Sequence, residues 1–87
     1  MPIAFTLIRT ESGKETEVLN ALLEQKEVQF AFTLLGRFDI IIRIQAEKME
    51  DVRAVIFNVI RKLPYIVDTT TLVAAEGKDK SYEPISM

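Results

Sequence analysis

The first half of the chain switches twice between the hydrophobic period of a strand and that of a helix. The side chains of residues 3–9 fall alternately on two faces, and the segment is rich in strand-forming residues. This predicts a first strand. The following segment, "ESGKETEVLNALLEQ", carries one apolar stripe at helical spacing, formed by Val18, Leu19, Leu22 and Leu23. Ser12 and Glu15 have the spacing of a capping box, so we expect the helix to begin there. Residues 28–35 return to a period of two, with Val28, Phe30, Phe32 and Leu34 on one face, and predict a second strand.

The second half repeats this order of elements. Residues 40–46 alternate and predict a third strand, joined to the second by a short connection around Gly36 and Asp39, as in an antiparallel hairpin. Apolar residues then recur at helical spacing over residues 49–63, and Pro64 is expected to end this second helix. Residues 65–75, rich in β-branched side chains, predict a fourth strand.

Two successive strand-helix-strand units of this size predict an α+β fold of the ferredoxin-like type, βαββαβ. In that arrangement a four-stranded antiparallel sheet carries both helices on one face. We expect a single domain over residues 1–75, and a loose polar tail over residues 76–87, "EGKDKSYEPISM".

Apolar side chains are also expected on the face of the sheet that the helices leave open. The residues assigned to it are Ala31, Leu35, Ile41, Val67 and Val73. Each large apolar side chain removed from water stabilises a protein by about 1.5–3 kcal/mol. A second subunit is therefore expected to cover this face, giving a dimeric α+β barrel. Phe57 lies off the apolar stripe of the second helix and is expected to point outward or sideways, either as a contact or as a ring leaning over the helix edge.

Charge and composition exclude several classes of function. The 11 basic residues are spread along the chain without a cluster and the net charge is −2, so direct nucleic-acid binding is not expected. Because the chain has no cysteine and no histidine, thiolate nucleophiles, histidine-based catalysis, haem ligation and the usual zinc sites are excluded. We expect no cofactor and no enzymatic activity. No segment approaches the roughly 18 apolar residues of a membrane span, and a cytoplasmic location is expected.

Two groups of residues are candidates for binding a ligand. The hairpin connection contains Gly36, Arg37, Phe38 and Asp39, and the fourth strand contains Thr69 and Thr71. As structural residues, Gly36 supplies an unusual backbone shape, Asp39 hydrogen-bonds its own loop, and the threonines follow strand preference. As a binding site, the hydroxyls and free peptide groups suit a small zwitterion such as an amino acid, which needs both donors and acceptors. The residues alone leave both interpretations open.

The order of these motifs resembles the effector-binding (RAM) domain of the Lrp/AsnC family of regulators. The resemblance covers residues 3–75 through "GKETEVLNALLE", "GRFD", "IRKLP" and "TTTLV". It implies a sheet-to-sheet dimer that assembles further into a tetramer of dimers, with an amino acid bound near the hairpin at a contact between dimers. By this resemblance Gly36, Phe38, Asp39, Thr69 and Thr71 fall on family positions, whereas Arg37 lies where the family varies and is expected to tune the ligand.

Two features depart from the family pattern. Tyr65 replaces the glycine usual after the helix-ending proline, which puts the local turn in doubt. The chain also opens almost directly onto its first strand, without the family's helix-turn-helix domain. It therefore resembles a stand-alone member that does not hold DNA by itself and either senses an amino acid or co-assembles with full-length regulators.

Three other functions remain open at this stage. One is a small cofactor-free enzyme of the dimeric α+β barrel superfamily, with Asp39 as its base. Another is a purely structural oligomerisation adaptor whose hairpin site is empty. The third is an ACT-type regulatory domain, for which the ligand is expected near the loop after the first strand, and fold alone does not separate these.

Overall fold

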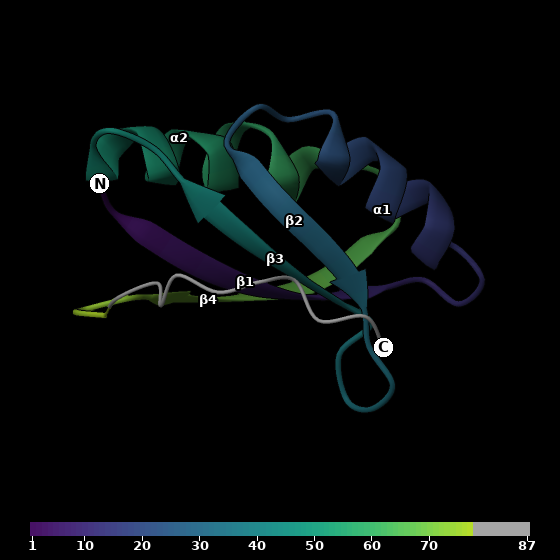
Figure 1. The fold of residues 1–87 in the computed structure, drawn as a ribbon. Helices are drawn as coiled ribbons and strands as arrows, with labels where there is room; N and C mark the ends of the chain where they lie inside the picture. Colours follow the sequence, from purple (N-terminus) through teal and green to yellow (C-terminus); the bar gives the residue numbers. More distant parts are fainter. Residues whose placement is uncertain (78–87) are drawn as a thin grey trace.

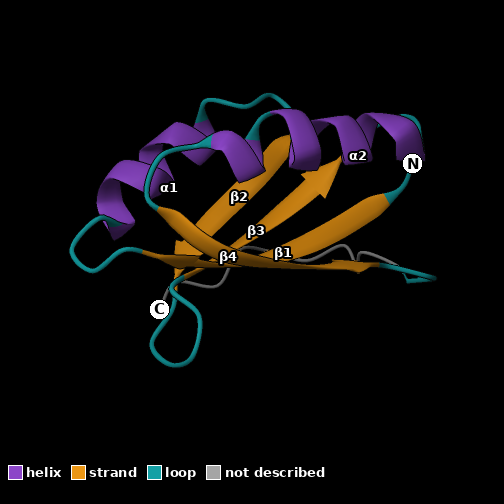
Figure 2. Cartoon of the chain, turned by 180° about the vertical axis from the view of Figure 1, so that it is seen from behind, coloured by secondary structure: helices purple, strands orange, loops and turns teal. Residues whose placement is uncertain are grey.

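The protein is a two-layer α+β structure, as predicted. The computed structural model describes residues 1–77, so most of the expected tail lies outside the described residues. The elements are β1 (Ile3–Thr10), α1 (Glu15–Leu23), β2 (Val28–Thr33), β3 (Ile40–Gln45), α2 (Met49–Asn58), a 3₁₀ helix η1 (Ile60–Lys62) and β4 (Ile66–Val73). The strands form an antiparallel sheet of order β2-β3-β1-β4. Both helices cover one face of it, and the other face carries no helix (Figures 1 and 2).

The hydrophobic core lies between the sheet and the helices. Alternate residues of the two central strands point into it and are buried: Ala4 and Ile8 of β1, and Ile40, Ile42 and Ile44 of β3. The helices close it with Val18 and Leu22 of α1, and with Val52, Val55, Ile56 and Ile60 of α2 and η1. The predicted stripe on α1 is thus partly confirmed, but Leu23 remains 49% exposed at the end of the helix.

The predicted capping box is wrong. Helix α1 begins at Glu15 after Lys14, and no side chain caps it. The preceding residues form a tight turn instead, in which the Lys14 amide donates to the Glu11 carbonyl at 3.1 Å and Gly13 has a φ of +81°. Because that turn comes between Ser12 and the helix, Ser12 lies outside the N-cap position.

Strand β2 contains a bulge that changes which residues share a face. Val28 pairs with Ile44, but Phe30 pairs with Arg43, so Gln29 is an extra residue between them. Beyond the bulge, Phe32 pairs with Ile41 and Ala31 pairs with the buried Ile42. The prediction that Val28, Phe30 and Phe32 share one face is therefore wrong, as is the placement of Ala31 on the open face.

A second irregularity lies where β4 pairs with β1. Asp68 pairs with Arg9 and Ile66 with Thr10, which leaves Val67 unpaired between them. Further along, Val73 pairs with Ala4, whose side chain is buried under the helices. Val73 therefore lies on the helix-covered face, at its exposed edge, and not on the open face as expected.

The turn before β4 is built on Tyr65 in a conformation that glycine favours. Tyr65 has a φ of +72°, which costs a residue with a side chain roughly 1–2 kcal/mol. Its carbonyl accepts a hydrogen bond from the Glu11 amide at 2.8 Å, and the Lys14 ammonium lies 4.7 Å from its ring centre. These contacts hold Tyr65 in place, so the departure from glycine leaves the fold unchanged.

The second helical segment is shorter than predicted. Helix α2 ends at Asn58, and the chain continues as η1 before Pro64. Phe57 points outward, as expected, with 52% of its surface exposed and the Arg61 guanidinium 5.2 Å from its ring centre. Neither α1 nor α2 has the length and apolar character to cross a membrane, and the same holds for every helix within residues 1–77.

Candidate functional site

The hairpin connection between β2 and β3 projects away from the helices, past the open face of the sheet (Figure 1). Its glycine, Gly36, has a φ of +139°, a region that residues with a side chain rarely adopt. Leu35 and Arg37 on either side are exposed, whereas Phe38 is half-buried. The loop therefore presents peptide groups and a guanidinium at the rim of the open face.

Asp39 anchors the base of this hairpin. Its backbone amide donates to the Ile8 carbonyl, its carbonyl accepts from the Leu34 amide, and its side-chain Oδ2 accepts from the Thr10 amide, each at 2.8 Å. The structural interpretation expected the carboxylate to bond to its own loop. It bonds instead to the end of β1. Asp39 fixes where the hairpin leaves the sheet.

Thr10, next to Asp39, has a buried hydroxyl whose hydrogen bonds are not satisfied. Its Oγ1 has no hydrogen-bond partner among residues 1–77, and the residue is 9% exposed. A buried hydroxyl without a partner costs free energy, and such groups are rare in folded proteins. No pattern in the sequence marks this feature, because it depends on the packing of β1 against the hairpin.

The threonines of β4 point toward the helix-covered side. Thr71 pairs with Thr6 in the ladder, and their hydroxyl oxygens are 3.0 Å apart. Thr6 is fully buried, so Thr71 satisfies a hydroxyl that water does not reach. Thr69 pairs with Ile8 and lines a small hollow of about 160 Å³ beside Arg61 and Asp68.

The hydroxyl pair predicts an asymmetric pair of mutants. Thr71→Val leaves the buried Thr6 hydroxyl without a partner, and we expect it to lower the free energy of unfolding by about 1–3 kcal/mol. Thr6→Val leaves Thr71 half-exposed to water and is expected to cost less, and the double Val mutant should be close to the wild type. Urea denaturation of the four proteins checks this. Additive losses in the double mutant would show that the two hydroxyls are not coupled.

One chain does not bring the two groups of candidate ligand residues together. The Asp39 amide contacts Ile8 from the β3 side, and Thr69 pairs with Ile8 from the β4 side. The two therefore lie about two strand spacings apart, roughly 10 Å, with β1 between them. The hairpin also projects from the open face, whereas Thr69 and Thr71 share the helix-covered face.

An exposed ion pair lies at the start of α1. The ammonium of Lys14 donates a hydrogen bond to Glu17 Oε1 at 3.3 Å, which together with the charge of Glu17 raises the pKa of Lys14. This pair is solvent-exposed and lies on α1, away from the hairpin. No cluster of acidic side chains suited to a metal ion occurs in the part of the chain that the structure describes.

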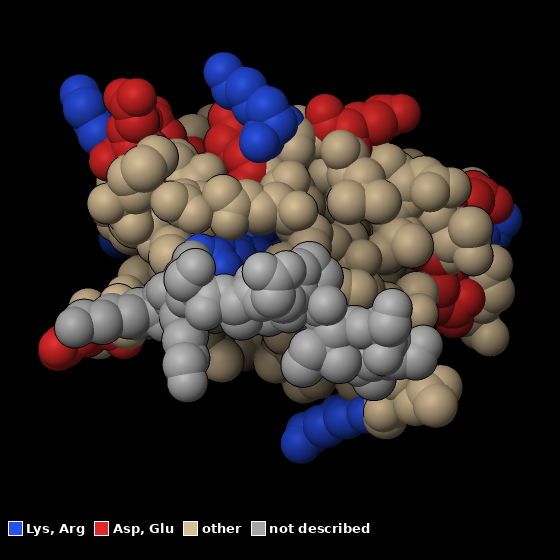
Figure 3. Space-filling model, viewed as in Figure 1, with Lys and Arg blue, Asp and Glu red and all other residues tan. Residues whose placement is uncertain are grey.

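The open face of the sheet is largely apolar, although Arg43 of β3 also lies on it, between Phe5 and Phe30. Cross-strand pairing places Phe5 and Leu7 of β1, Phe30 and Phe32 of β2, Ile41 of β3 and Leu72 of β4 on it. Phe32 and Leu72 are 59% and 57% exposed, and the rings of Phe30 and Phe32 are 5.1 Å apart. Charged side chains gather mainly along the helical layer, as Figure 3 shows from one side. The prediction of a second apolar face therefore holds, although largely through residues other than those expected.

Comparison with known proteins gives a consistent picture. A family model described as "Lrp/AsnC ligand binding domain" matches residues 3–83. The HTH-type transcriptional regulator FL11 of Pyrococcus abyssi (strain GE5 / Orsay) is 25% identical over 81 residues, which cover 93% of this chain and 53% of FL11. The chain thus spans about half the length of this curated relative.

Solved structures share the fold. The crystal structure of FFRP-DM1 is 38% identical, with a TM-score of 0.82, and the match covers 85% of this chain and 99% of that one. The transcriptional regulator NMB0573 of Neisseria meningitidis, solved as a complex with L-Met, has a TM-score of 0.80 at 13% identity, covering 92% of this chain and 53% of that one. At that identity the likeness shows the fold alone.

Proposed function

Because the chain belongs to the Lrp/AsnC ligand-binding domain family, we propose that it binds a small amino acid and self-associates through the open face of its sheet. It acts by binding and not by catalysis. Its second role is to modulate full-length transcription regulators of the family by co-assembly. The observation that carries the proposal is the anchored Gly36–Asp39 hairpin, which projects beside an uncovered apolar face.

The proposed ligand site is centred on the base of the hairpin. An amino acid needs hydrogen-bond donors for its carboxylate and acceptors for its ammonium. The connection from Gly36 to Asp39 supplies peptide groups of both kinds, and the Thr10 hydroxyl is a buried polar group still without a partner among residues 1–77. The L-Met complex of NMB0573, which has the same fold, supports an amino acid as the ligand class.

Assembly completes the proposed site. Thr69 and Thr71 lie across β1 from the hairpin of their own chain and share its helix-covered face, so they reach a ligand held there only from a subunit of a second dimer, at a contact outside the open face. Thr69 is the better candidate of the two, because the Thr71 hydroxyl already bonds to Thr6. Arg37, exposed on the hairpin, is positioned to select among ligand side chains.

Calorimetric titration with the twenty amino acids tests this proposal. We expect at least one of them to bind, and expect Asp39→Asn and Thr69→Ala each to weaken binding about tenfold or more, the loss of one charge-assisted or buried hydrogen bond. Asp39→Asn is preferred to Asp39→Ala because the amide oxygen of asparagine can still accept from the Thr10 amide. If no amino acid binds, the chain is an oligomerisation adaptor with no ligand. If one binds but neither substitution changes its affinity, the ligand is held elsewhere and the proposed site is wrong.

Thr10→Val tests the role of the buried Thr10 hydroxyl, which has no hydrogen-bond partner among residues 1–77. Valine has the shape of threonine and keeps the backbone amide that bonds to Asp39, so stability should stay the same or rise slightly. Ligand affinity should fall if the hydroxyl bonds to the amino acid. Unchanged affinity for the same ligand would move the site away from the base of the hairpin.

A further inference from the structure

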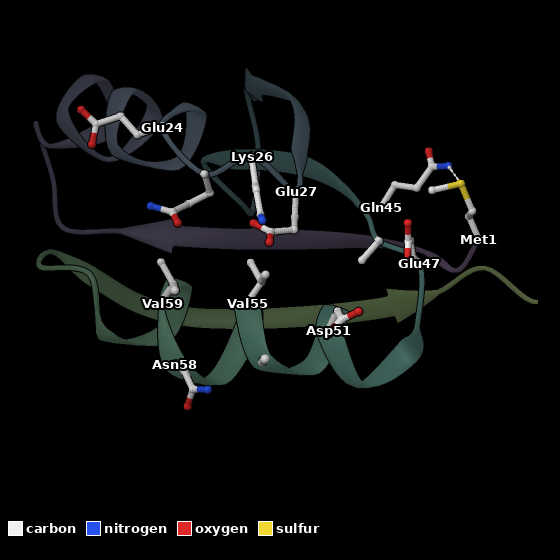
Figure 4. A pocket seen from close by; sticks show the side chains of 13 residues that line it. Met1, Glu24, Lys26, Glu27, Gln45, Glu47, Asp51, Val55, Asn58 and Val59 are labelled. Atoms are coloured by element: carbon white, nitrogen blue, oxygen red, sulfur yellow. Dashed lines mark hydrogen bonds between the residues drawn. The ribbon is translucent and has the colours of Figure 1, made fainter.

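A groove lies on the helical side of the chain, separate from the hairpin and from the open face of the sheet. It has a volume of about 990 Å³ and runs between the end of α1, the start of β2 and the outer side of α2 (Figure 4). Its floor is small and apolar: Ala46 after β3, and Ala54, Val55 and Val59 along α2 and its end. A dimer formed through the open face of the sheet would leave this groove uncovered.

One stripe of α2 forms a whole wall of the groove. Asp51, Ala54, Val55, Asn58 and Val59 follow one another at spacings of three and four residues, which places them on one side of a helix. The adjacent stripe, with Val52 and Ile56, packs into the core. Within this stripe Val55 is buried in the core and Val59 is half-buried, so the part open to a partner helix is Ala54, with Asp51 and Asn58 on either side of it.

The rim of the groove is acidic. Glu24, Glu27, Glu47 and Asp51 line it against one lysine, Lys26. Four carboxylates and one ammonium give the groove a net charge of −3, whereas the whole chain carries −2. The groove is thus more acidic than the chain as a whole, although nine of the 13 acidic residues lie outside it.

These carboxylates are available to a partner. Among residues 1–77 the ion pairs that the structure shows, Lys14 with Glu17 and Lys48 with Glu50, use none of the four. Figure 4 shows Glu24 at the end of α1, Glu27 near the middle of the groove, Glu47 beside Gln45 and Met1, and Asp51 on α2. Long cationic side chains lying on the apolar floor would reach them with their charged ends.

We propose that this groove binds a cationic amphipathic helix of a protein partner. The apolar face of that helix packs on Ala46, Ala54 and Val59, and its lysine or arginine side chains pair with the carboxylates of the rim. Charge complementarity sets the class of partner, and the apolar floor distinguishes a protein helix from a free polyamine, which needs only the carboxylates. This site is independent of the amino-acid site, so either can exist without the other.

The test uses the full chain and a labelled synthetic peptide of about 18 residues, or five helical turns, with alanine and leucine on one face and lysine on the other. Fluorescence anisotropy should show saturable binding that weakens as salt is added, and a peptide with glutamate in place of lysine should not bind. No saturable binding of the lysine peptide below about 1 mM overturns the proposal.

Two neighbouring carboxylates on α2 provide a matched control. Asp51 lines the groove and Glu50 does not, so Asp51→Asn should lower the affinity for the lysine peptide at least threefold. Combining Glu24→Gln with Asp51→Asn should lower that affinity at least tenfold. Glu50→Gln should have no effect. If Glu50→Gln and Asp51→Asn lowered the peptide affinity equally, the peptide would be attracted to the acidic surface in general. That result would overturn the proposal of a specific site in the groove.

Ala54→Met tests the apolar floor separately from the charge. The longer side chain partly fills the groove, so peptide affinity should fall at least threefold while the affinity for spermine, a polyamine, stays the same. If Ala54→Met changes neither affinity, or spermine displaces the peptide at equal concentration, the groove binds cations by electrostatic attraction alone and no helix packs in it.

Discussion

Replacing Ile41 by glutamate is expected to convert the proposed dimer into a monomer. Ile41 lies at the centre of the open face, paired with Leu7 on β1 and with Phe32 on β2. In a sheet-to-sheet dimer its side chain is buried among apolar neighbours, and an unpaired carboxylate there costs several kcal/mol. A loss of about 3–4 kcal/mol raises the dissociation constant of the dimer by roughly two to three orders of magnitude. Light scattering over a range of micromolar concentrations measures the change.

Phe57→Glu is the control for that experiment. Phe57 is also apolar and is more exposed than the half-buried Ile41, at 52%, but it lies on the helical layer. Its substitution should leave the mass in solution unchanged. A wild-type chain that is monomeric, or an assembly that survives Ile41→Glu but is broken by Phe57→Glu, would show that the subunits do not meet through the open face.

The order of elements was predictable because each of them has a strong hydrophobic period. The alternation of residues 40–46 between the two faces of the sheet is regular. The prediction therefore correctly put Ile40, Ile42 and Ile44 on one face and Ile41 and Arg43 on the other. In the two edge strands, however, a single extra residue reverses every side chain that follows it. Gln29 and Val67 have ordinary strand propensity, so the sequence pattern contains nothing that marks them as bulges.

This reversal changes the chemistry of the open face. An unbroken alternation would have put Ala31 there, and the bulge at Gln29 puts Phe30 and Phe32 there instead. Two aromatic rings bury far more apolar surface on association than one alanine. The structure therefore strengthens the inference of a dimer while changing the residues on which it rests.

The candidate site was predictable only in part. Gly36 and Asp39 stand out in the sequence because a glycine and a charge separate two apolar runs. The partners of Asp39 and Thr71, which are the Thr10 amide and the Thr6 hydroxyl, come from β1, far away along the chain. Such contacts depend on strand register, which is set by the whole sheet and not by the local sequence.

The positions of the site and of the open face predict a linkage between them. The hairpin projects past the open face, where a second subunit would pack, so a ligand that bonds to both subunits binds the assembled state more tightly (Figure 1). By thermodynamic linkage, such a ligand must also strengthen assembly by the same factor. Ligand binding and the mass of the assembly are therefore expected to change together.

Ile42→Ala is expected to have the largest effect on folding of any single substitution considered, and its neighbour Ile41 provides the comparison. Ile42 is fully buried between the sheet and the helices, so the substitution leaves a cavity and should lower the free energy of unfolding by about 2–5 kcal/mol. Small domains have only about 5–15 kcal/mol in total, so much of the variant should unfold at modest urea concentration.

Ile41→Ala removes the same atoms from the opposite face of the same strand. This substitution should weaken the dimer and leave the stability of the single subunit nearly unchanged, because the open face is covered only when a second subunit packs on it. Urea denaturation at two protein concentrations about tenfold apart separates the effects, since the stability of a dimer rises with concentration and that of a monomer does not. Ile42→Ala should shift both curves equally, whereas Ile41→Ala should bring them together. If Ile41→Ala destabilised the chain as much as Ile42→Ala at both concentrations, Ile41 would belong to the core of a single subunit, and the sheet would have no free apolar face for a partner.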